Sequence, residues 1–332
     1  MISIIKNKRI AVSLGVIAIL ALYLVFSGKD KKSGDVPDVK KLDAIDEILI
    51  LKKDKQIKLS YKDNKWLINE QAYPADKQTV EKLEKDMKEL EITDFISKGP
   101  YYTKYDLMPE QAVKVVVKNK GKTERDILIG KTSSTNRNTY VKFAGDEKVY
   151  LASGNLPDDF NKDVEELRDK QIYKVGKDEV LSFELLYNGR LSFEKKTEEV
   201  DEKDNMHAKE KDKDKSKEKK KIKTEKWICK EFPGIEMDKN KVDSFVNSIS
   251  SVRADSFTDI NKKDLSGVIC QIKTKVYGKE IELKVHKKDK DNYLCTSSES
   301  PYVFILREGN TKRFFKTLSD FKQDMKPGKK AK

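Results

Sequence analysis

The chain has 332 residues, of which 37% are hydrophobic and 38% charged, and its formal net charge is +13. This length favours two or three domains, and both fractions are shifted toward polar residues relative to an average globular domain. The positive charge alone would suit nucleic acid. However, Lys alternates with Asp and Glu nearly throughout, and Arg, the better residue for bidentate contacts to phosphate and bases, is scarce. We therefore expect no nucleic-acid partner.

The N-terminal residues predict a membrane anchor. Ile10 to Phe26 carries no charged residue and as a helix would be about 26 Å long, enough for a thin or untilted bilayer. A cleaved signal peptide is the alternative, but Ser27-Gly28-Lys29 is a poor cleavage site and no Cys follows for lipid attachment. We expect residues 1–28 to form a cytoplasmic tail and a single transmembrane helix that contacts the bilayer through Ile10–Phe26.

Flanking charge predicts the orientation. The short tail has Lys6, Lys8 and Arg9 and no acid, whereas the other flank mixes Lys with Asp. The positive-inside rule then keeps the tail in the cytoplasm and places the bulk of the chain outside it, at the cell membrane. Residues 29–41 (KDKKSGDVPDVKK) are typical of a flexible stalk.

One sequence unit occurs twice. Lys65 to Phe95 reads KWLINEQAYPADKQTVEKLEKDMKELEITDF, and a second version begins at Lys226. Each has Lys-Trp, a short apolar run, a Pro, an Asp before a helical pattern and a strand-like end at Phe. Trp66 and Trp227 are the only tryptophans in the chain. We predict an α+β fold with two tandem antiparallel-sheet-plus-helix units, residues 42–172 and 173–325.

In unit one, apolar residues alternate with polar residues in short runs, as half-buried antiparallel strands require. Asp76 can cap a helix over 77–91, whose apolar stripe is Val80, Leu83, Met87 and Leu90. The pattern predicts strands over 45–52, 56–62, 65–69, 92–97, 112–119, 124–129, 138–143 and 148–152, and a closing helix that begins at Pro157 with Phe160, Val164 and Leu167 inward.

Unit two repeats the same order. Its strands are expected over 180–186, 190–194, 227–229, 268–273, 280–285, 292–296 and 302–306. Asp238 is expected to cap a helix with Val242, Phe245, Val246 and Ile249 inward, and a closing helical pattern follows at Phe314, Leu318 and Phe321. The joint at 195–225 is long and has 12 Lys and 10 Asp or Glu from Lys196 to Lys226. We predict a disordered charged insertion there, because it has too little apolar surface to fold. Residues 326–332 form a basic tail.

A tyrosine cluster is the one candidate binding surface. Tyr101, Tyr102 and Tyr105 follow the strand over 92–97, and tyrosine combines an apolar ring with a polar tip. The alternative is that these rings cover the edge of the sheet.

Motifs for catalysis, metals and cofactors are missing from the sequence, so we expect no enzyme activity and no cofactor. His207 falls in the predicted loop, and His286 is expected at an exposed strand end. Cys229 and Cys270 align with core positions, whereas Cys295 aligns with Lys142 and is expected to face solvent. A Cys270–Cys295 disulfide is possible only if their strands are adjacent.

The repeat resembles the domain of unknown function 4340 family. The resemblance rests on KWLIN, YPADKQTVEKLEKDMKEL, KYDLMPEQAVKVVV, ILIGKTSSTNRNTYVKFAGDEKVYLAS and VEELRDKQI, and covers residues 42 to 325 without the loop. It implies an N-terminally anchored bacterial envelope protein, of a kind often found beside ABC-type transport components, and it brings no active-site residues. At Tyr105-Asp106-Leu107 this chain departs from the commoner Tyr-Gly-Leu.

Three functions follow in order of preference. The first is a non-enzymatic accessory or scaffold component of an ABC-type membrane transport system. The second is an extracytoplasmic binding module for an envelope polymer or small ligand, through Tyr101, Tyr102 and Tyr105 or the cleft between the units. The third is a hydrolase, which would need acids with perturbed pKa values gathered in a cleft.

Overall fold

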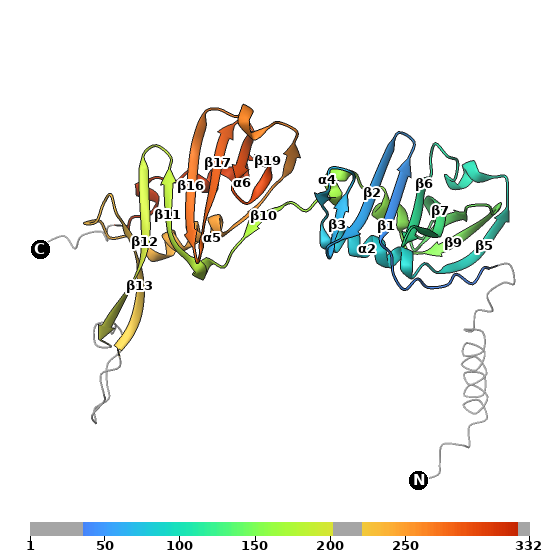
Figure 1. Cartoon of the computed structure of the whole chain (residues 1–332), viewed down its shortest axis with the longest axis horizontal. Helices are drawn as coiled ribbons and strands as arrows, with labels where there is room; N and C mark the ends of the chain where they lie inside the picture. Colours follow the sequence, from blue (N-terminus) through green and yellow to red (C-terminus); the bar gives the residue numbers. More distant parts are fainter. Residues whose placement is uncertain (1–35, 202–220, 325–332) are drawn as a thin grey trace, which may run out of the picture. The chain divides into compact units, whose positions relative to one another are not determined.

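The computed structural model describes residues 36–201 and 221–324. The chain divides into two compact units, with the boundary between Asp169 and Lys170 (Figure 1). Both units are mostly antiparallel β-structure with few and short helices, so the α+β prediction is right in its two large antiparallel sheets and overstates the helices. The proposed anchor Ile10–Phe26 and the basic tail lie outside the described residues. Within the described ranges, no helix is long and apolar enough to span a bilayer.

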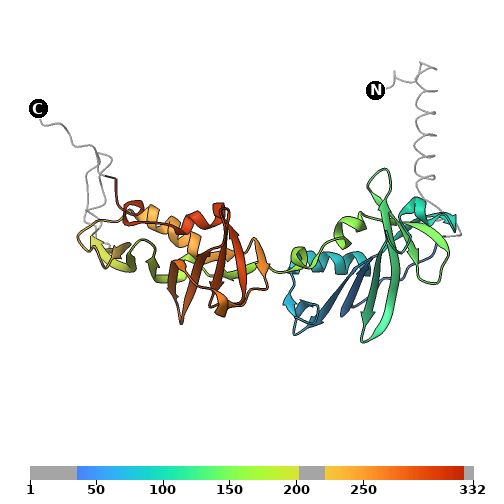
Figure 2. The same ribbon diagram turned by 90° about the horizontal axis from the view of Figure 1, so that it is seen from above.

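Unit one is a nine-stranded sheet in the order β4-β3-β2-β1-β6-β7-β8-β9-β5. Its helices gather on one side of the sheet (Figure 2). The elements are β1 (Glu47–Lys52), β2 (Lys55–Lys62), β3 (Lys65–Ile68), β4 (Tyr73–Pro74), α2 (Lys77–Lys88), β5 (Ile92–Lys98), η1 (Tyr102–Tyr105), β6 (Val113–Asn119), β7 (Lys122–Thr132), β8 (Asn138–Phe143), β9 (Lys148–Ser153), α3 (Leu156–Phe160) and α4 (Val164–Leu167).

Unit two has an eight-stranded sheet in the order β13-β12-β11-β16-β17-β18-β19-β15, and β10 pairs with β14 in a separate two-stranded sheet. The elements are β10 (Gln171–Lys174), η2 (Lys177–Glu179), β11 (Val180–Leu186), β12 (Arg190–Asp201), β13 (Lys221–Cys229), α5 (Lys239–Ser250), β14 (Ser251–Arg253), β15 (Ser256–Thr258), η4 (Lys262–Asp264), β16 (Val268–Val276), β17 (Lys279–Lys287), β18 (Asn292–Ser297), β19 (Ser300–Arg307), α6 (Glu308–Thr311), η5 (Lys312–Phe314) and η6 (Leu318–Asp320).

The two large sheets share most of one strand order. In both, four strands follow one another in sequence on one side of the first strand, and a strand that comes after the main helix closes the far edge; on the other side of the first strand lie three strands in unit one and two in unit two. The main helices are also built alike. Asp76 accepts from Thr79 N–H at the start of α2, and Asp238 accepts from Asn240 and Lys241 N–H at the start of α5.

The predicted apolar stripes of both helices are confirmed as core. Val80, Leu83, Met87 and Leu90 are at most 4% exposed in unit one, and the stripe of α5 (Val242, Phe245, Val246 and Ile249) is equally buried in unit two. A stripe at this spacing faces one direction because the helix turns once every 3.6 residues.

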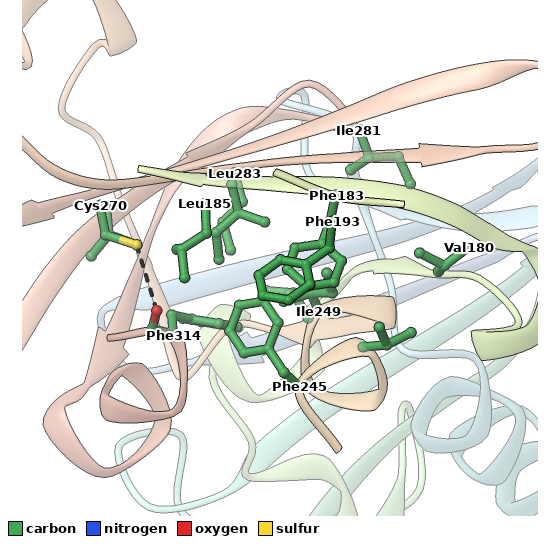
Figure 3. Close-up of a cluster of buried hydrophobic side chains, with 14 of the residues drawn as sticks. Val180, Phe183, Leu185, Phe193, Phe245, Ile249, Cys270, Ile281, Leu283 and Phe314 are labelled. Carbon is green, nitrogen blue, oxygen red and sulfur yellow. Dashed lines mark hydrogen bonds between the residues drawn. The ribbon is translucent and has the colours of Figure 1, made fainter. Parts of the chain in front are cut away.

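The core of unit two is aromatic (Figure 3). The Phe183 and Phe193 rings stack with centroids 4.7 Å apart, and Phe245 of α5 lies 5.1 Å from Phe183. Cys270 points into the same core, where its thiol lies 3.8 Å from Phe314 O (Figure 3). Cys229 is also fully buried. The core placement of both cysteines is therefore confirmed.

The prediction for Cys295 is wrong, because its side chain is fully buried. Cys295 pairs with Val285 across β17 and β18, as Val141 pairs with Ile129 across β8 and β7. The correct equivalent of Cys295 is thus Val141, and an alignment shifted by one residue assigns a strand residue to the opposite face. All three cysteines are free thiols.

His286 is likewise not at an exposed strand end. It is 5% exposed, and its Nδ1 lies 3.0 Å from Ser266 O. The segment before β16 therefore covers this end of β17, which a reading of the strand by itself could not show.

Both segments expected to be flexible are partly ordered. Within the predicted stalk, Val36 and Val39 pack on the core of unit one together with Leu42. Within the predicted insertion 195–225, β12 and β13 stay paired as far as Asp201 and Lys221, so this hairpin extends past β11 (Figure 1). His207 lies outside the described residues.

The closing helices are shorter than predicted. Phe160 and Leu167 are buried as expected but belong to two separate helices, α3 and α4. In unit two Phe314 and Phe321 are buried by 3₁₀ turns instead of an α-helix. The apolar positions are right, and the regular helix between them is wrong.

Each unit fixes the start of its main helix with a backbone hydrogen bond. Asp76 N–H donates to Leu167 O in unit one (2.8 Å), and Asp238 N–H donates to Phe321 O in unit two (2.8 Å). These bonds tie the last segment of each unit to the residue that caps the helix, so the unit closes on itself.

Tyr173 in β10 offers a direct test of unit two. Its hydroxyl is buried and has no hydrogen-bond partner in the part of the chain that the structure describes, and burial raises the pKa of Tyr173. We expect Tyr173→Phe to stabilise unit two by about 1 kcal/mol, because it removes an unsatisfied buried hydroxyl and keeps the ring. In a Trp66→Phe background, chemical unfolding followed by Trp227 fluorescence measures the change. A loss of stability would show that the hydroxyl has a partner.

Candidate functional site

The tyrosine cluster divides into a buried and an exposed part. Tyr105 is 8% exposed, its ring centroid lies 4.7 Å from that of Tyr140, and it packs with Leu107 and Val149 in a small cluster. Leu128 also contacts this cluster, whereas its neighbours in β7 point into the main core. Since successive strand residues face opposite sides, the cluster lies on the sheet face away from α2. Tyr105 is therefore a core residue.

Tyr102 is held in place by its polar tip. Its hydroxyl donates to Glu147 O (3.0 Å), and Lys142 Nζ lies 5.4 Å from the centre of its ring. Burial, together with the nearby charges of Glu147 and Asp146, raises the pKa of Tyr102. Tyr101 is 69% exposed. Of the three tyrosines, Tyr101 alone offers most of its ring to a ligand.

The turn after Tyr105 explains the departure from Tyr-Gly-Leu. Asp106 has φ 55° and ψ 37°, which is the left-handed region that glycine adopts most easily and that Asp tolerates better than most residues. The turn also rests on Gly130 in β7, where an added Cβ would lie 2.1 Å from Tyr105 O. The sequence showed the unusual residue but not the reason for it.

A pair of acids between α2 and α3 was not predicted as a site. Lys82 forms an ion pair with Asp159, and its Nζ lies 3.8 Å from Asp86 Oδ2. Lys162 Nζ lies 3.5 Å from Asp159 Oδ1. Asp86 Oδ2 is buried with no hydrogen-bond partner in the described ranges. Burial, opposed by the Lys82 charge and reinforced by Asp159, raises the pKa of Asp86 to about 6.

Raised carboxyl pKa values occur at acid–base sites and in structural ion-pair networks alike. The hollow beside α3, of about 300 Å³, is lined by Pro157, Asp158, Asn161, Lys162 and Glu166. Asp86 and Asp159 do not line this hollow; they join two helices. Their arrangement supports a structural role, in which one lysine holds two carboxyl groups between α2 and α3.

The sign of the pH effect follows from this raised pKa. Folded Asp86 binds its proton more tightly than unfolded Asp86, so its ionisation costs stability as pH rises from about 4 to about 6. At pH 7 we expect Asp86→Asn to stabilise unit one by about 1–2 kcal/mol, after allowance for solvent screening. At pH 4 the gain should nearly vanish. Urea unfolding at both pH values measures it.

Asp94→Asn is the control for this prediction, since Asp94 is exposed on β5. We expect this variant to change the free energy of unfolding by less than about 0.5 kcal/mol at either pH. An Asp86→Asn gain of the same size at pH 4 and pH 7 would contradict the assignment of the cost to the ionised carboxyl.

Unit one also has two hollows beside residues 36–42, which precede β1 and are called the leading segment here. One, of about 350 Å³, is lined by Val39, Lys40, Leu42, Thr123, Glu124, Arg125, Asp126, Phe143 and Ala144. The other, of about 490 Å³, is lined by Asp38, Val39, Lys40, Lys41, Glu89, Leu90, Glu91 and Ile92. Arg125 links α2 to the leading segment. Its guanidinium donates to Met87 O of α2 and to Lys40 O of the leading segment, the latter at 2.7 Å. Burial lowers the pKa of Arg125. The sequence did not single out this region.

Within the described ranges, no group of three or more His, Cys, Asp or Glu side chains is arranged to hold a metal ion. The structure thus offers three features for comparison: an exposed tyrosine on an otherwise packed loop, an acid pair between helices, and two hollows beside the leading segment.

Structurally, the chain is a protein of two similar units, each with a large antiparallel sheet and one main helix that an Asp caps. The family model described as domain of unknown function (DUF4340) matches residues 66–268, which span parts of both units. The chain belongs to this family. No curated protein matches the chain, and no solved structure matches it.

Proposed function

We propose that the chain is a membrane-anchored, extracytoplasmic, non-enzymatic scaffold that serves as an accessory component of an ABC-type membrane transport system. In this proposal Ile10–Phe26 is a single transmembrane helix with its N-terminus in the cytoplasm. Residues 42–172 and 173–325 are two tandem copies of one unit, for which the shared strand order of the sheets is the structural support.

The docking of the leading segment carries the proposal. Leu42 N–H donates to Lys88 O (3.1 Å), and Arg125 donates to Lys40 O (2.7 Å). The described part of unit one begins at Val36, and the nine residues 27–35 separate it from the proposed anchor. Nine residues span at most about 30 Å, so the sheet of unit one would be held close to the membrane, where an accessory subunit meets a membrane partner.

Photo-crosslinking in native membranes tests this function. A photoreactive phenylalanine analogue replaces Tyr101 or Tyr277, which are 69% and 70% exposed and lie in different units. We expect adducts that contain a transporter permease or ATPase, identified by mass spectrometry. Adducts no different from those of a chain without residues 1–28 would overturn the proposal.

A second candidate function is binding of an envelope polymer, which the exposed ring of Tyr101 beside Tyr102 and Lys142 favours. If this surface binds polymer, Tyr101→Ala should weaken co-sedimentation with isolated cell-wall material about three- to tenfold, the value of one aromatic contact. Tyr277→Ala is the matched control, because it removes an equally exposed tyrosine elsewhere. Equal losses in both variants, or no loss in either, would remove this candidate.

A further inference from the structure

The segment before the first strand meets the end of the main helix in the same way in both units. In unit one Leu42 N–H donates to Lys88 O, and in unit two Val175 N–H donates to Ser250 O (2.8 Å). Counting from these two bonds makes the four residues before Leu42 equivalent to β10. The three residues after Lys88 are likewise equivalent to β14.

In unit two these equivalent stretches form a ladder. Tyr173 of β10 pairs with Val252 of β14, and Lys174 pairs with Ser251. Tyr173 is 6% exposed and belongs to the main core of the unit. An extended strand with a buried aromatic side chain therefore fills the space beside the helix end in unit two.

In unit one the same place is a hollow. Among the described residues, no strand pairing joins 38–41 to 89–91. These two stretches, with Ile92, instead line the hollow of about 490 Å³. Lys40 stands where unit two has Tyr173. A lysine keeps its ammonium group in water and cannot fill an interior space as a tyrosine ring does, which accounts for the hollow.

The leading segment is fixed on the far side of this hollow. Lys40 O accepts from Arg125, Leu42 N–H donates to Lys88 O, and Val39 packs on the core. Although Leu42 is bonded to the helix end as Val175 is in unit two, residues 38–41 form no strand pairing with 89–91 in the described part of the chain. Lys40 O, Glu91 O and Glu89 N–H already have partners, so an added strand would bond the remaining backbone groups of these two stretches, as in the recognition of peptides by β-augmentation.

We propose that this hollow of unit one binds an extended peptide segment of a partner protein that places an aromatic side chain between residues 38–41 and 89–92. Unit two shows the chemistry that fits, because its own strand and Tyr173 fill the equivalent place. The charged lining residues are the acids Asp38, Glu89 and Glu91 and the bases Lys40 and Lys41, so acids exceed bases by one and a peptide with a basic residue beside the aromatic one is favoured. Binding here requires neither the membrane anchor nor a transporter and is independent of the proposed function.

The test uses a peptide that copies residues 170–175, Lys-Gln-Ile-Tyr-Lys-Val, blocked at both ends and labelled with a fluorophore. Titration of the full-length chain in detergent should give saturable binding, with a Kd of about 10–100 μM for one short strand. A peptide with Ala in place of Tyr should bind at least about tenfold more weakly. A photoreactive analogue at the tyrosine position should form adducts with residues 38–41 and 89–92.

Lys40→Tyr is the decisive chain variant, because it fills the hollow with the chain's own side chain and should abolish binding. Lys53→Tyr places the same change at an exposed turn and should bind as the unchanged chain does. Absence of saturation, equal binding by Lys40→Tyr, or adducts outside the hollow would each overturn the proposal. If residues 38–41 instead pair with 89–91 in the absence of a peptide, the titration would not saturate. If Lys40→Tyr does not fold, the adduct map of the unchanged chain decides.

Discussion

Gly130→Ala should destabilise unit one by about 3 kcal/mol or more, at the upper end of the cost of overpacking a core. The added Cβ would lie 2.1 Å from Tyr105 O and 3.0 Å from the Leu107 side chain. Because the nearest atom belongs to the backbone, a change of rotamer cannot relieve the clash. The turn at Asp106 would have to lift from β7, and Tyr105 would lose its contact with Tyr140.

The two tryptophans make this effect measurable for unit one alone. In a Trp227→Phe background, Trp66 of β3 is the only tryptophan, and it is buried in the core of unit one. Gly234→Ala is the control, because nothing lies within 4 Å of its added Cβ, and it should change the urea midpoint of the Trp66 signal little. A Gly130→Ala chain as stable as this control would show that the turn does not rest on β7.

Arg125→Met should cost unit one about 2 kcal/mol, with a further loss of order in its leading segment. The guanidinium donates to Met87 O and Lys40 O, and Met fills similar volume while leaving both carbonyls without this donor, at roughly 1–3 kcal/mol each before relaxation. Relief from the burial of a charge offsets part of that cost. Hydrogen exchange at Leu42 N–H should become at least tenfold faster.

Lys122→Met, in the same strand, separates this effect from a loss of positive charge. The Lys122 side chain is 76% exposed and pairs with Glu124 at the surface, and such pairs contribute about 0–1 kcal/mol. We expect neither the urea midpoint nor the exchange of Leu42 N–H to change appreciably in this variant. If Arg125→Met leaves that exchange unchanged, Arg125 does not hold the leading segment.

Regular elements with a clear period were predictable. Alternation with polar residues predicted that Ile48 and Ile50 of one strand, and Ile57, Leu59 and Tyr61 of the next, point inward. The structure confirms this for all but Tyr61, which is 44% exposed. An Asp before each helical stripe identified where α2 and α5 begin. These signals are local, since one strand or one helical turn contains the whole pattern.

Short pairings and single contacts were not predictable. β4, β10 and β14 have two to four residues, too few for a period to show. Arg125 donates to residues 38 and 85 positions away, and Asp86 meets an acid from a different helix. In the sequence, Asp86 looks like a surface partner of Lys82 on the same helix, and Gly130 looks like an ordinary strand glycine. Their roles depend on tertiary neighbours that no local pattern contains.

The bond from Asp76 N–H to Leu167 O also has a consequence for the order in which the chain folds during its synthesis. A chain emerges from the ribosome in order from its N-terminus. The last pairing of unit one, from Asp169 N–H to Pro74 O (2.8 Å), can form as soon as Asp169 emerges. None of the large sheet of unit two has emerged by then. Unit one can therefore complete its fold while the rest of the chain is still being synthesised.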